Sequence, residues 1–276
     1  MKLPFEIDLT GKVAVITGGG GVICSEFAQA LSACGCKTAL LDINWEAARK
    51  AAEMAGGDSI GIECDCLDKG SLESARKTVI EKLGPADILI NGAGGNNPKA
   101  TTDNEYMTKD LEGVKDFFSL ESSGLKFVFD LNITSAFLTT QVFARDMVGK
   151  GGNIINISSM NAYRPLTKIP AYSAAKAGVS NFTQWLAVHF APCGIRCNAM
   201  APGFFVTNQN RALLFRDDGT PTPRTDKIIA ATPMKRFGEV SELIGTLLWL
   251  VSDGASGFVT GITVPVDGGF SSYSGV

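Results

Sequence analysis

Short apolar runs alternate with longer amphipathic stretches along the whole chain. Seven runs are rich in Val, Ile, Leu and Ala, and they cover residues 12–17, 37–42, 59–64, 87–91, 153–158, 195–199 and 262–266. Continuous apolar runs of this length are typical of strands that are buried on both faces. Helical patterns separate them, at 22–34, after Trp45, and at 69–83, 124–148, 171–190 and 240–251. The alternation predicts an α/β fold, in which one seven-stranded parallel sheet is doubly wound and helices cover both faces.

Two segments between these elements are too long to be simple turns. They run over residues 95–123 and 203–238, and each follows the carboxyl end of a predicted strand. Long loops at that edge of a sheet usually carry function. We therefore expect short helices in both insertions, which would form the substrate-side walls or a lid of one domain spanning residues 1–276.

Composition and charge narrow the class of partner. The chain has 276 residues, 45% of them hydrophobic, and a formal charge of −3. Without a basic stripe, neither nucleic acid nor a polybasic membrane contact is expected. No apolar run approaches the roughly 18 residues that a membrane span needs, and the first residues do not resemble a signal peptide. The expected partner is a small molecule.

Cysteine and histidine usage restricts the chemistry further. None of the seven Cys residues forms a C-x-x-C pair, so they are interpreted as reduced thiols of a cytoplasmic protein. His189 is the only histidine. A Ser-His-Asp triad elsewhere and a His-rich zinc site are thus excluded, and no metal is expected.

A glycine-rich turn joins the first strand to the first helix. Gly18 to Gly21 follow Thr17, and Val22 begins the helical pattern. Such a turn suits a pyrophosphate, because the backbone can approach closely and the helix start offers free N–H groups. A tight strand–helix turn without a ligand is the alternative. Asp42 ends the second strand, where a carboxylate can bind the adenosine ribose hydroxyls or cap the next helix.

The neighbourhood of Asp42 indicates which nicotinamide cofactor is favoured. The next three residues are Ile43, Asn44 and Trp45, so no cation lies there to compensate a 2′-phosphate. NAD is therefore favoured over NADP. The fourth strand ends in the small residues of 91–94 (Asn-Gly-Ala-Gly), which would let a nucleotide cross the sheet edge or would simply form a turn.

The best acid–base candidates lie at the start of the 171–190 helix. Tyr172 and Lys176 are four residues apart and share one helix face, and Ser159 ends the preceding strand. Hydride transfer to a carbonyl needs a proton donor at the developing alkoxide. An adjacent ammonium would lower the pKa of a tyrosine from its free value of about 10, and Ser159 could hold the substrate oxygen.

Taken together, these motifs resemble the short-chain dehydrogenase/reductase family over essentially the whole chain. The motifs that carry the resemblance are Thr17-Gly18, Asp42, Asn91 to Gly94, Asn132, Ser159, Tyr172-x-x-x-Lys176 and Pro202-Gly203. The resemblance implies a Rossmann-type NAD-binding catalytic domain with the catalytic residues Asn132, Ser159, Tyr172 and Lys176. It also implies that Asn132 bends its helix and holds a water in a proton relay to Lys176.

The same resemblance implies a set of cofactor contacts. Asp65 would meet the adenine, and residues 202–207 would pack on the nicotinamide, with a backbone contribution from Phe205. The full expected set is Gly18, Gly20, Gly21, Val22, Ile23, Asp42, Asp65, Cys66, Asn91, Gly92, Ala93, Tyr172, Lys176, Pro202, Gly203, Phe205 and Thr207. One departure stands out, because Val22 and Cys24 occupy the places of the family's last two turn glycines. Gly20 and Gly21 are expected to supply the missing freedom one step earlier.

Several stretches resemble the D-mannonate oxidoreductase (fructuronate reductase) subgroup of this family, among them 101–106, 158–168, 181–189 and the tail 269–276. That resemblance implies oxidation of a sugar-acid hydroxyl, or reduction of the ketone. Arg suits a carboxylate, so Arg164 is expected to neutralise the substrate acid. Other candidate substrate contacts are Asn96, Asn161, Lys168 and Arg211.

Four alternatives remain at this stage. The enzyme could act on a gluconate-type acid, on a polyol, or on a 3-oxoacyl substrate. Less in keeping with the intact Tyr172 and Lys176 is a non-catalytic NAD-binding protein. The family resemblance further implies subunit packing through helices such as 177–188 and 240–251, hence a homotetramer or homodimer.

Overall fold

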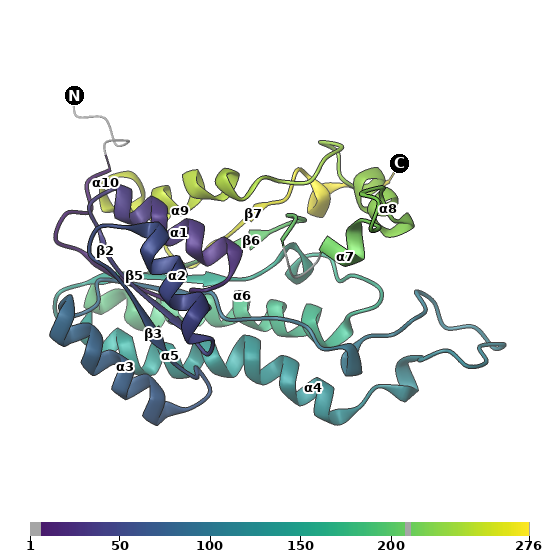
Figure 1. Ribbon diagram of the computed structural model, residues 1–276, viewed down its shortest axis with the longest axis horizontal. Helices are drawn as coiled ribbons and strands as arrows, with labels where there is room; N and C mark the ends of the chain where they lie inside the picture. Colours follow the sequence, from purple (N-terminus) through teal and green to yellow (C-terminus); the bar gives the residue numbers. More distant parts are fainter. Residues whose placement is uncertain (1–6, 208–210, 276) are drawn as a thin grey trace.

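The computed structural model describes residues 7–207 and 211–275. Seven parallel strands form one sheet in the order β3-β2-β1-β4-β5-β6-β7, which confirms the predicted fold class. The strands are β1 (Val13–Thr17), β2 (Lys37–Asp42), β3 (Ser59–Glu63), β4 (Ile88–Asn91), β5 (Gly152–Ile157), β6 (Ile195–Pro202) and β7 (Thr263–Val266). Figure 1 shows helices on both sides of this sheet.

The longer helices follow the predicted ranges within a few residues. They are α1 (Val22–Ala33), α2 (Trp45–Ala55), α3 (Lys69–Lys82), α4 (Ser122–Phe129), α5 (Ser135–Phe143), α6 (Pro170–Phe190) and α9 (Ile244–Val251). The 240–251 segment begins as a 3-10 turn, η7 (Val240–Leu243), which opens with a capping box between Glu239 and Glu242. A short helix that the sequence analysis did not predict, α10 (Asp253–Ser256), follows α9.

Alternate residues of β1 supply the two cores. Val13 and Val15 pack in one core with residues of α3, α5 and α6, while Ala14 and Ile16 pack in the other with residues of α1 and α9. Figure 1 shows α1 and α9 on one side of the sheet and α3, α5 and α6 on the other. All of β1 is buried, as expected for a central strand that is covered on both faces.

The strand order reverses between β1 and β4. The chain proceeds from β1 through β2 to β3 on one side of the sheet and then returns to β4, which lies on the opposite side of β1. Thr17 of β1 is paired with Asn91 of β4. At such a reversal the crossover helices diverge to opposite faces and leave a crevice outside the carboxyl ends of the strands. The ends of β1 and β4 therefore define where a ligand site is expected.

The predicted 124–148 helix is interrupted in its middle. After α4 the chain forms a π-helical turn, η3 (Asp130–Thr134), before α5 and the 3-10 turn η4 (Ala144–Asp146). Asn132 in this turn donates its side-chain amide to the carbonyl of Val128 at 2.7 Å. A side chain inserted into the backbone ladder is an identifiable cause of helix distortion.

By length and composition, Ser122–Asp146 is apolar enough to cross a membrane. Half of its most apolar window is buried inside the protein, and the core helix of a soluble protein passes the same test. The stretch is weak evidence for a membrane span.

Both long insertions contain short helices, as expected. The first holds the 3-10 turns η1 (Pro98–Ala100) and η2 (Phe117–Ser119), and the second holds α7 (Arg211–Leu214) and α8 (Pro223–Ala231). Figure 1 shows both insertions at the same end of the molecule. An ion pair of 2.6 Å between Lys227 and Glu105 joins them.

A buried polar network ties β4 to its neighbours. The Asn91 amide donates to Thr140 at 3.0 Å and to Asn156 at 2.8 Å, and its carbonyl oxygen accepts from Thr139 at 2.6 Å. Asn156 in turn donates to Thr183 of α6. The network joins strands β4 and β5 to helices α5 and α6 through side chains that are all buried.

Replacing Asn91 by Ala should destabilise the protein substantially. The change leaves buried partners without hydrogen bonds, and each such loss costs about 1–3 kcal/mol. We expect the free energy of unfolding to fall by roughly 2–4 kcal/mol in denaturant titrations. The exposed Asn96 provides a matched control, and Asn96→Ala should change stability by less than about 0.5 kcal/mol. Equal effects of the two changes would contradict a structural role for this network.

Candidate active site

A cavity of about 600 Å³ opens at the carboxyl ends of β1, β4 and β5. Most of the predicted site residues line it, namely Gly18, Gly20, Gly21, Val22, Ile23, Asp42, Gly92, Ala93, Ser159, Tyr172, Lys176, Pro202, Gly203, Phe205 and Thr207. The topology therefore gathers residues that are far apart in the sequence, from Gly18 to Thr207, at the strand reversal. Lys176 is the one Lys or Arg among the described residues that line this cavity.

The glycine turn differs from the expectation in one respect. Gly18 adopts a left-handed φ of +64°, but Gly20 and Gly21 do not have positive φ. Gly20 is needed because there is no room for a side chain, since a Cβ at this position would lie 2.5 Å from that of Ala47. The proposed transfer of backbone freedom to Gly20 and Gly21 is therefore wrong. Cys24 instead fills space toward β4, where a Cβ on Gly92 would lie 2.2 Å from its sulfur.

Thr17 connects the glycine turn to the end of β4. Its hydroxyl oxygen accepts hydrogen bonds from the backbone N–H groups of Gly92 at 3.1 Å and Ala93 at 3.2 Å. Two partly buried donors are thereby satisfied where the strands separate. These bonds fix the relative positions of the two loops that form the cavity floor.

Asp42 braces the glycine turn from the end of β2. One carboxylate oxygen accepts from the Gly20 N–H at 3.0 Å, and the other accepts from the Asn44 N–H at 2.9 Å. The alternative reading of Asp42 as a helix cap is wrong, since Asn44 is the N-cap of α2 and accepts from Ala47. Asp42 lines the cavity and carries a negative charge where ribose hydroxyls are expected to bind.

Asn132 lies behind the cavity wall rather than on it. Its side chain exchanges two hydrogen bonds with the backbone of Gly95, accepting from the N–H at 3.2 Å and donating to the carbonyl at 2.7 Å. A Cβ on Gly94 would lie 2.7 Å from the Asn132 carbonyl oxygen and 3.0 Å from Lys176 Nζ. The two polar groups therefore approach the same glycine, and no larger residue would fit between them.

Tyr172 and Lys176 project from the first turns of α6 toward Ser159. Lys176 is buried, and its ammonium donates to the carbonyl of Ile157 at 2.7 Å. Nζ lies 5.6 Å from the centre of the Tyr172 ring. Ser159 follows β5 and accepts from the Asn161 N–H at 3.2 Å. The helix start and the strand end therefore meet as predicted.

Burial dominates the acid–base properties of this group. It lowers the pKa of Lys176 from 10.5 to about 8, because the ammonium loses its hydration. It also raises the pKa of the Tyr172 phenol, and the hydrogen bond with Ser159 lowers that pKa only in part. The expected depression of the Tyr172 pKa by Lys176 is therefore not found. At neutral pH the phenol is protonated and can donate a proton to a developing alkoxide.

Three of the predicted cofactor residues do not line the cavity. Asp65 accepts from the Leu67 N–H within its own turn at 2.8 Å. Cys66 is buried in the core that contains α3. The side chain of Asn91 belongs to the polar network described above. Of the three, only Asn91 lies on a strand that borders the cavity, and its contribution there is structural.

The predicted substrate residues are scattered. The guanidinium of Arg164 donates to the carbonyl of Tyr273 at 2.6 Å, away from the cavity, and Arg211 stacks on Phe215 at 5.6 Å. Asn96 donates to Thr101. Asn161 is buried beside Ser159, and its side-chain oxygen has no hydrogen-bond partner among the described residues. Lys168 lines a neighbouring cavity.

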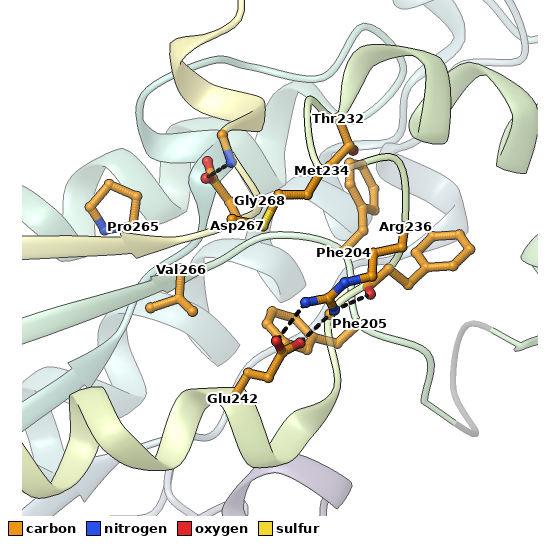
Figure 2. Close-up of a pocket in the computed structure, with 13 residues that line it drawn as sticks. Phe204, Phe205, Thr232, Met234, Arg236, Glu242, Pro265, Val266, Asp267 and Gly268 are labelled. Atoms are coloured by element: carbon orange, nitrogen blue, oxygen red, sulfur yellow. Dashed lines mark hydrogen bonds and ion pairs between the residues drawn. The ribbon is translucent and has the colours of Figure 1, made fainter.

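Phe204 lies within the predicted 202–207 stretch without having been singled out there, and it borders three cavities. Figure 2 shows one of them, a space of about 380 Å³ beyond Phe204 and Phe205, with the Arg236–Glu242 ion pair on its wall. Arg224 and Lys227 of α8 line another cavity and were also missed. No motif marks these positions, because their roles follow from the path of the second insertion.

No group of three or more His, Cys, Asp or Glu side chains that could hold a metal ion occurs within residues 7–207 and 211–275. The polar groups of the cavity are a carboxylate, hydroxyls, a phenol and an ammonium. Such a set suits the binding of a nucleotide and the transfer of a proton.

Comparison with known proteins adds a family and close relatives. The model of a family described as enoyl-(acyl carrier protein) reductase matches residues 21–271. An uncharacterised oxidoreductase of Haemophilus influenzae is 55% identical over 281 residues, which is 100% of this chain and 99% of the relative. The uncharacterised oxidoreductase UxuB of Bacillus subtilis is 53% identical and covers 99% of this chain and 100% of its own length.

A solved structure resembles this fold along its full length. It is provisionally described as a D-mannonate oxidoreductase from Haemophilus influenzae with bound NAD. The TM-score is 0.95 and the identity 54%, and the comparison covers 100% of both chains.

Replacing Lys176 by Met should make the protein more stable at pH 7. Because the folded-state pKa lies below the unfolded value, the burial penalty is fully present below pH 8 and disappears between about pH 8 and 10.5. The difference between the two pKa values corresponds to a destabilisation of the parent by roughly 3 kcal/mol. The variant also loses the hydrogen bond to Ile157, which lowers its own stability by about 1 kcal/mol.

A gain of about 2 kcal/mol in unfolding free energy at pH 7 is therefore expected for Lys176→Met. The variant's stability advantage over the parent should disappear as the pH rises from 8 to 10.5, because the parent no longer buries a charged ammonium. Chemical denaturation across this pH range measures both effects. A variant that is less stable than the parent at pH 7 would contradict the claim that burial of the Lys176 ammonium destabilises the fold.

Proposed function

The chain belongs to the short-chain dehydrogenase/reductase family, and from that premise we propose that it is an NAD-dependent oxidoreductase acting on D-mannonate and its ketone D-fructuronate. The observation that carries the chemistry is the convergence of Ser159, Tyr172 and Lys176 on one cavity that also contains Asp42. The substrate rests on similarity to the solved structure described as a D-mannonate oxidoreductase.

The residues present fit NAD. The glycine turn leaves room for a pyrophosphate at the start of α1, and the Asp42 carboxylate can accept hydrogen bonds from ribose hydroxyls. No described cation lines the cavity near Asp42 to bind a 2′-phosphate. When bound, NAD supplies the hydride acceptor, and its reduced form supplies the hydride donor. We propose that the predicted contacts at the cavity, from Gly18 to Thr207, hold this cofactor.

Each of the proposed catalytic residues has a separate role in proton transfer or in binding. Tyr172 donates a proton to the ketone oxygen during reduction and accepts one from the hydroxyl during oxidation. Ser159 holds that oxygen beside the phenol. Lys176 binds the nicotinamide ribose and, through its bond to the Ile157 carbonyl, holds the start of α6 against the end of β5. Asn132 fixes the Gly95 backbone and holds the water that links Lys176 to solvent.

We also propose that residues 1–276 act as one catalytic domain in the cytoplasm. One sheet contains all seven strands, and the cavity takes residues from the turn after β1 as well as from the segment after β6. All seven cysteines are free, which suits a reducing compartment.

A homodimer or homotetramer is proposed from an aromatic strip on α5 and α6. Phe137 stacks on Phe182 with ring centres 3.6 Å apart, and Trp185 stacks on His189 at 4.5 Å. Trp185 is 56% exposed and Phe137 is 41% exposed. A contiguous exposed apolar patch of this kind marks an association surface.

Light scattering of Trp185→Asp tests this assembly. A charge placed in an apolar interface is left without a partner, so the variant should have a smaller mass than the parent. The matched change Met54→Asp, at an exposed site on α2, should leave the mass unchanged. Identical masses of Trp185→Asp and the parent oligomer would contradict association through this strip.

An absorbance assay at the reduced-nicotinamide band tests the function. Rapid reduction of NAD is expected with D-mannonate, and little with NADP or with D-gluconate, a polyol or a 3-hydroxyacyl substrate. Tyr172→Phe should lower kcat by roughly 10²–10⁴-fold and leave NAD affinity unchanged, because it removes only the proton-transferring hydroxyl. Turnover of another panel member would discard mannonate and keep the mechanism. An unimpaired Tyr172→Phe would discard the mechanism.

A further inference from the structure

A second cavity, of about 360 Å³, adjoins the active site on the side of the second insertion. Its walls come from the segment that leads into α6, from α8, and from Phe204 and Phe270. Phe204 also lines the catalytic cavity, so the two spaces share a wall. Figure 1 shows α8 beyond the start of α6, at the end of the molecule that carries both insertions.

Positive charge dominates this cavity. Lys168, Arg224 and Lys227 line it, against a single carboxylate, that of Glu105. Glu105 pairs with Lys227 at 2.6 Å. In the part of the chain that the structure describes, Lys168 and Arg224 have no ion-pair partner within 4.0 Å. Two cationic charges therefore remain available to an anion.

We infer that Arg224 and Lys168 bind the carboxylate of the substrate in this cavity and thereby select acids over neutral sugars. This inference rests on the proposed function and names its specificity residues. It replaces Arg164, which the sequence analysis favoured and which the structure places on the carbonyl of Tyr273. Arg224 is the stronger anchor, because a guanidinium binds a carboxylate through two parallel hydrogen bonds.

The position of the cavity suits a six-carbon acid. Lys168 lies four residues before Tyr172, immediately ahead of α6 (Pro170–Phe190). Phe204 lines both this cavity and the one that contains Tyr172, so a carboxylate held between Lys168 and Arg224 would belong to a ligand that adjoins the proposed catalytic residues. The 21-residue helix α6 has no side-chain cap at its start, and the positive end of its dipole adds to the attraction for a negative group.

The proposed recognition depends on the net charge of the cavity. Ile169, Ile228 and Phe270 supply the apolar part of its wall, whereas Arg224 is exposed to solvent and free to close on a bound anion. A neutral CH₂OH group in place of the carboxylate would leave the two cations without an anionic partner. The cavity is therefore expected to discriminate through charge, whereas the hydroxyl pattern of the sugar is read elsewhere.

A matched pair of substrates isolates the carboxylate. D-Fructose carries CH₂OH where D-fructuronate carries the carboxylate, and the two are otherwise the same ketose. Arg224→Met should raise the KM for D-fructuronate by roughly 10–100-fold, as expected for a lost charge-assisted hydrogen bond. Its kcat/KM for D-fructose should stay within about 2-fold of the parent. Arg224→Lys should recover part of the loss.

Two further variants complete the test. Lys168→Met should act in the same direction as Arg224→Met with a smaller effect, because a lysine forms a single contact. Arg145→Met removes the same charge from a distant exposed pair with Glu73 and should change neither KM. An unchanged D-fructuronate KM in Arg224→Met overturns the inference and leaves the proposed function in place.

Failure of the proposed function is recognised separately. If the parent turns over no sugar acid, calorimetric titration with D-mannonate and D-mannitol in the presence of NAD tests whether the cavity still binds a carboxylate. The carboxylate site is supported, even without turnover, if the parent binds D-mannonate more tightly than D-mannitol. This preference should be lost in Arg224→Met and kept in Arg145→Met. Equal binding of the two ligands by the parent, or retention in Arg224→Met, overturns it.

Discussion

The hydrogen bond from Lys176 to the carbonyl of Ile157 joins α6 to the end of β5, and the placement of Tyr172 beside Ser159 depends on it. Through this bond the helix that carries Tyr172 is held against the strand that leads into Ser159. The ammonium is buried to make it, and that burial depresses its pKa. Functional sites commonly retain such destabilising groups, because the same desolvation that weakens the fold strengthens the electrostatic action of the charge.

A second constraint holds the opposite side of the cavity. Asn132 satisfies the backbone of Gly95 and the carbonyl of Val128 with one side chain, inside a helix that is locally π-helical. The distortion is therefore compensated by hydrogen bonds, and the approach to Gly94 brings Asn132 close to Lys176. Together with Thr17 at the end of β1, these contacts make the cavity floor a connected polar structure that does not depend on loops alone.

The sequence was sufficient for the parts of the structure that follow from periodicity. The seven strands were predicted because parallel strands buried on both faces read as short apolar runs, and β2 matches the predicted 37–42 range. The Tyr172–Lys176 pair was predictable because helical spacing fixes which residues share a face. Its pKa values were not, since they depend on burial by distant segments. The same holds for Gly20, whose need is a close approach to Ala47 and not a special φ.

The substrate side was predicted least well, for a physical reason. The sequence favours Arg164 over Lys168, but the chain path sends Arg164 to the C-terminal tail and Lys168 to the cavity beside α8. Arg224 and Lys227 reach that cavity only because the second insertion folds back toward the first, where Lys227 pairs with Glu105. The residues proposed for cofactor binding and proton transfer thus lie at the sheet edge, which regular patterns encode. The residues proposed to recognise the substrate anion lie on irregular segments, whose long-range contacts no local pattern specifies.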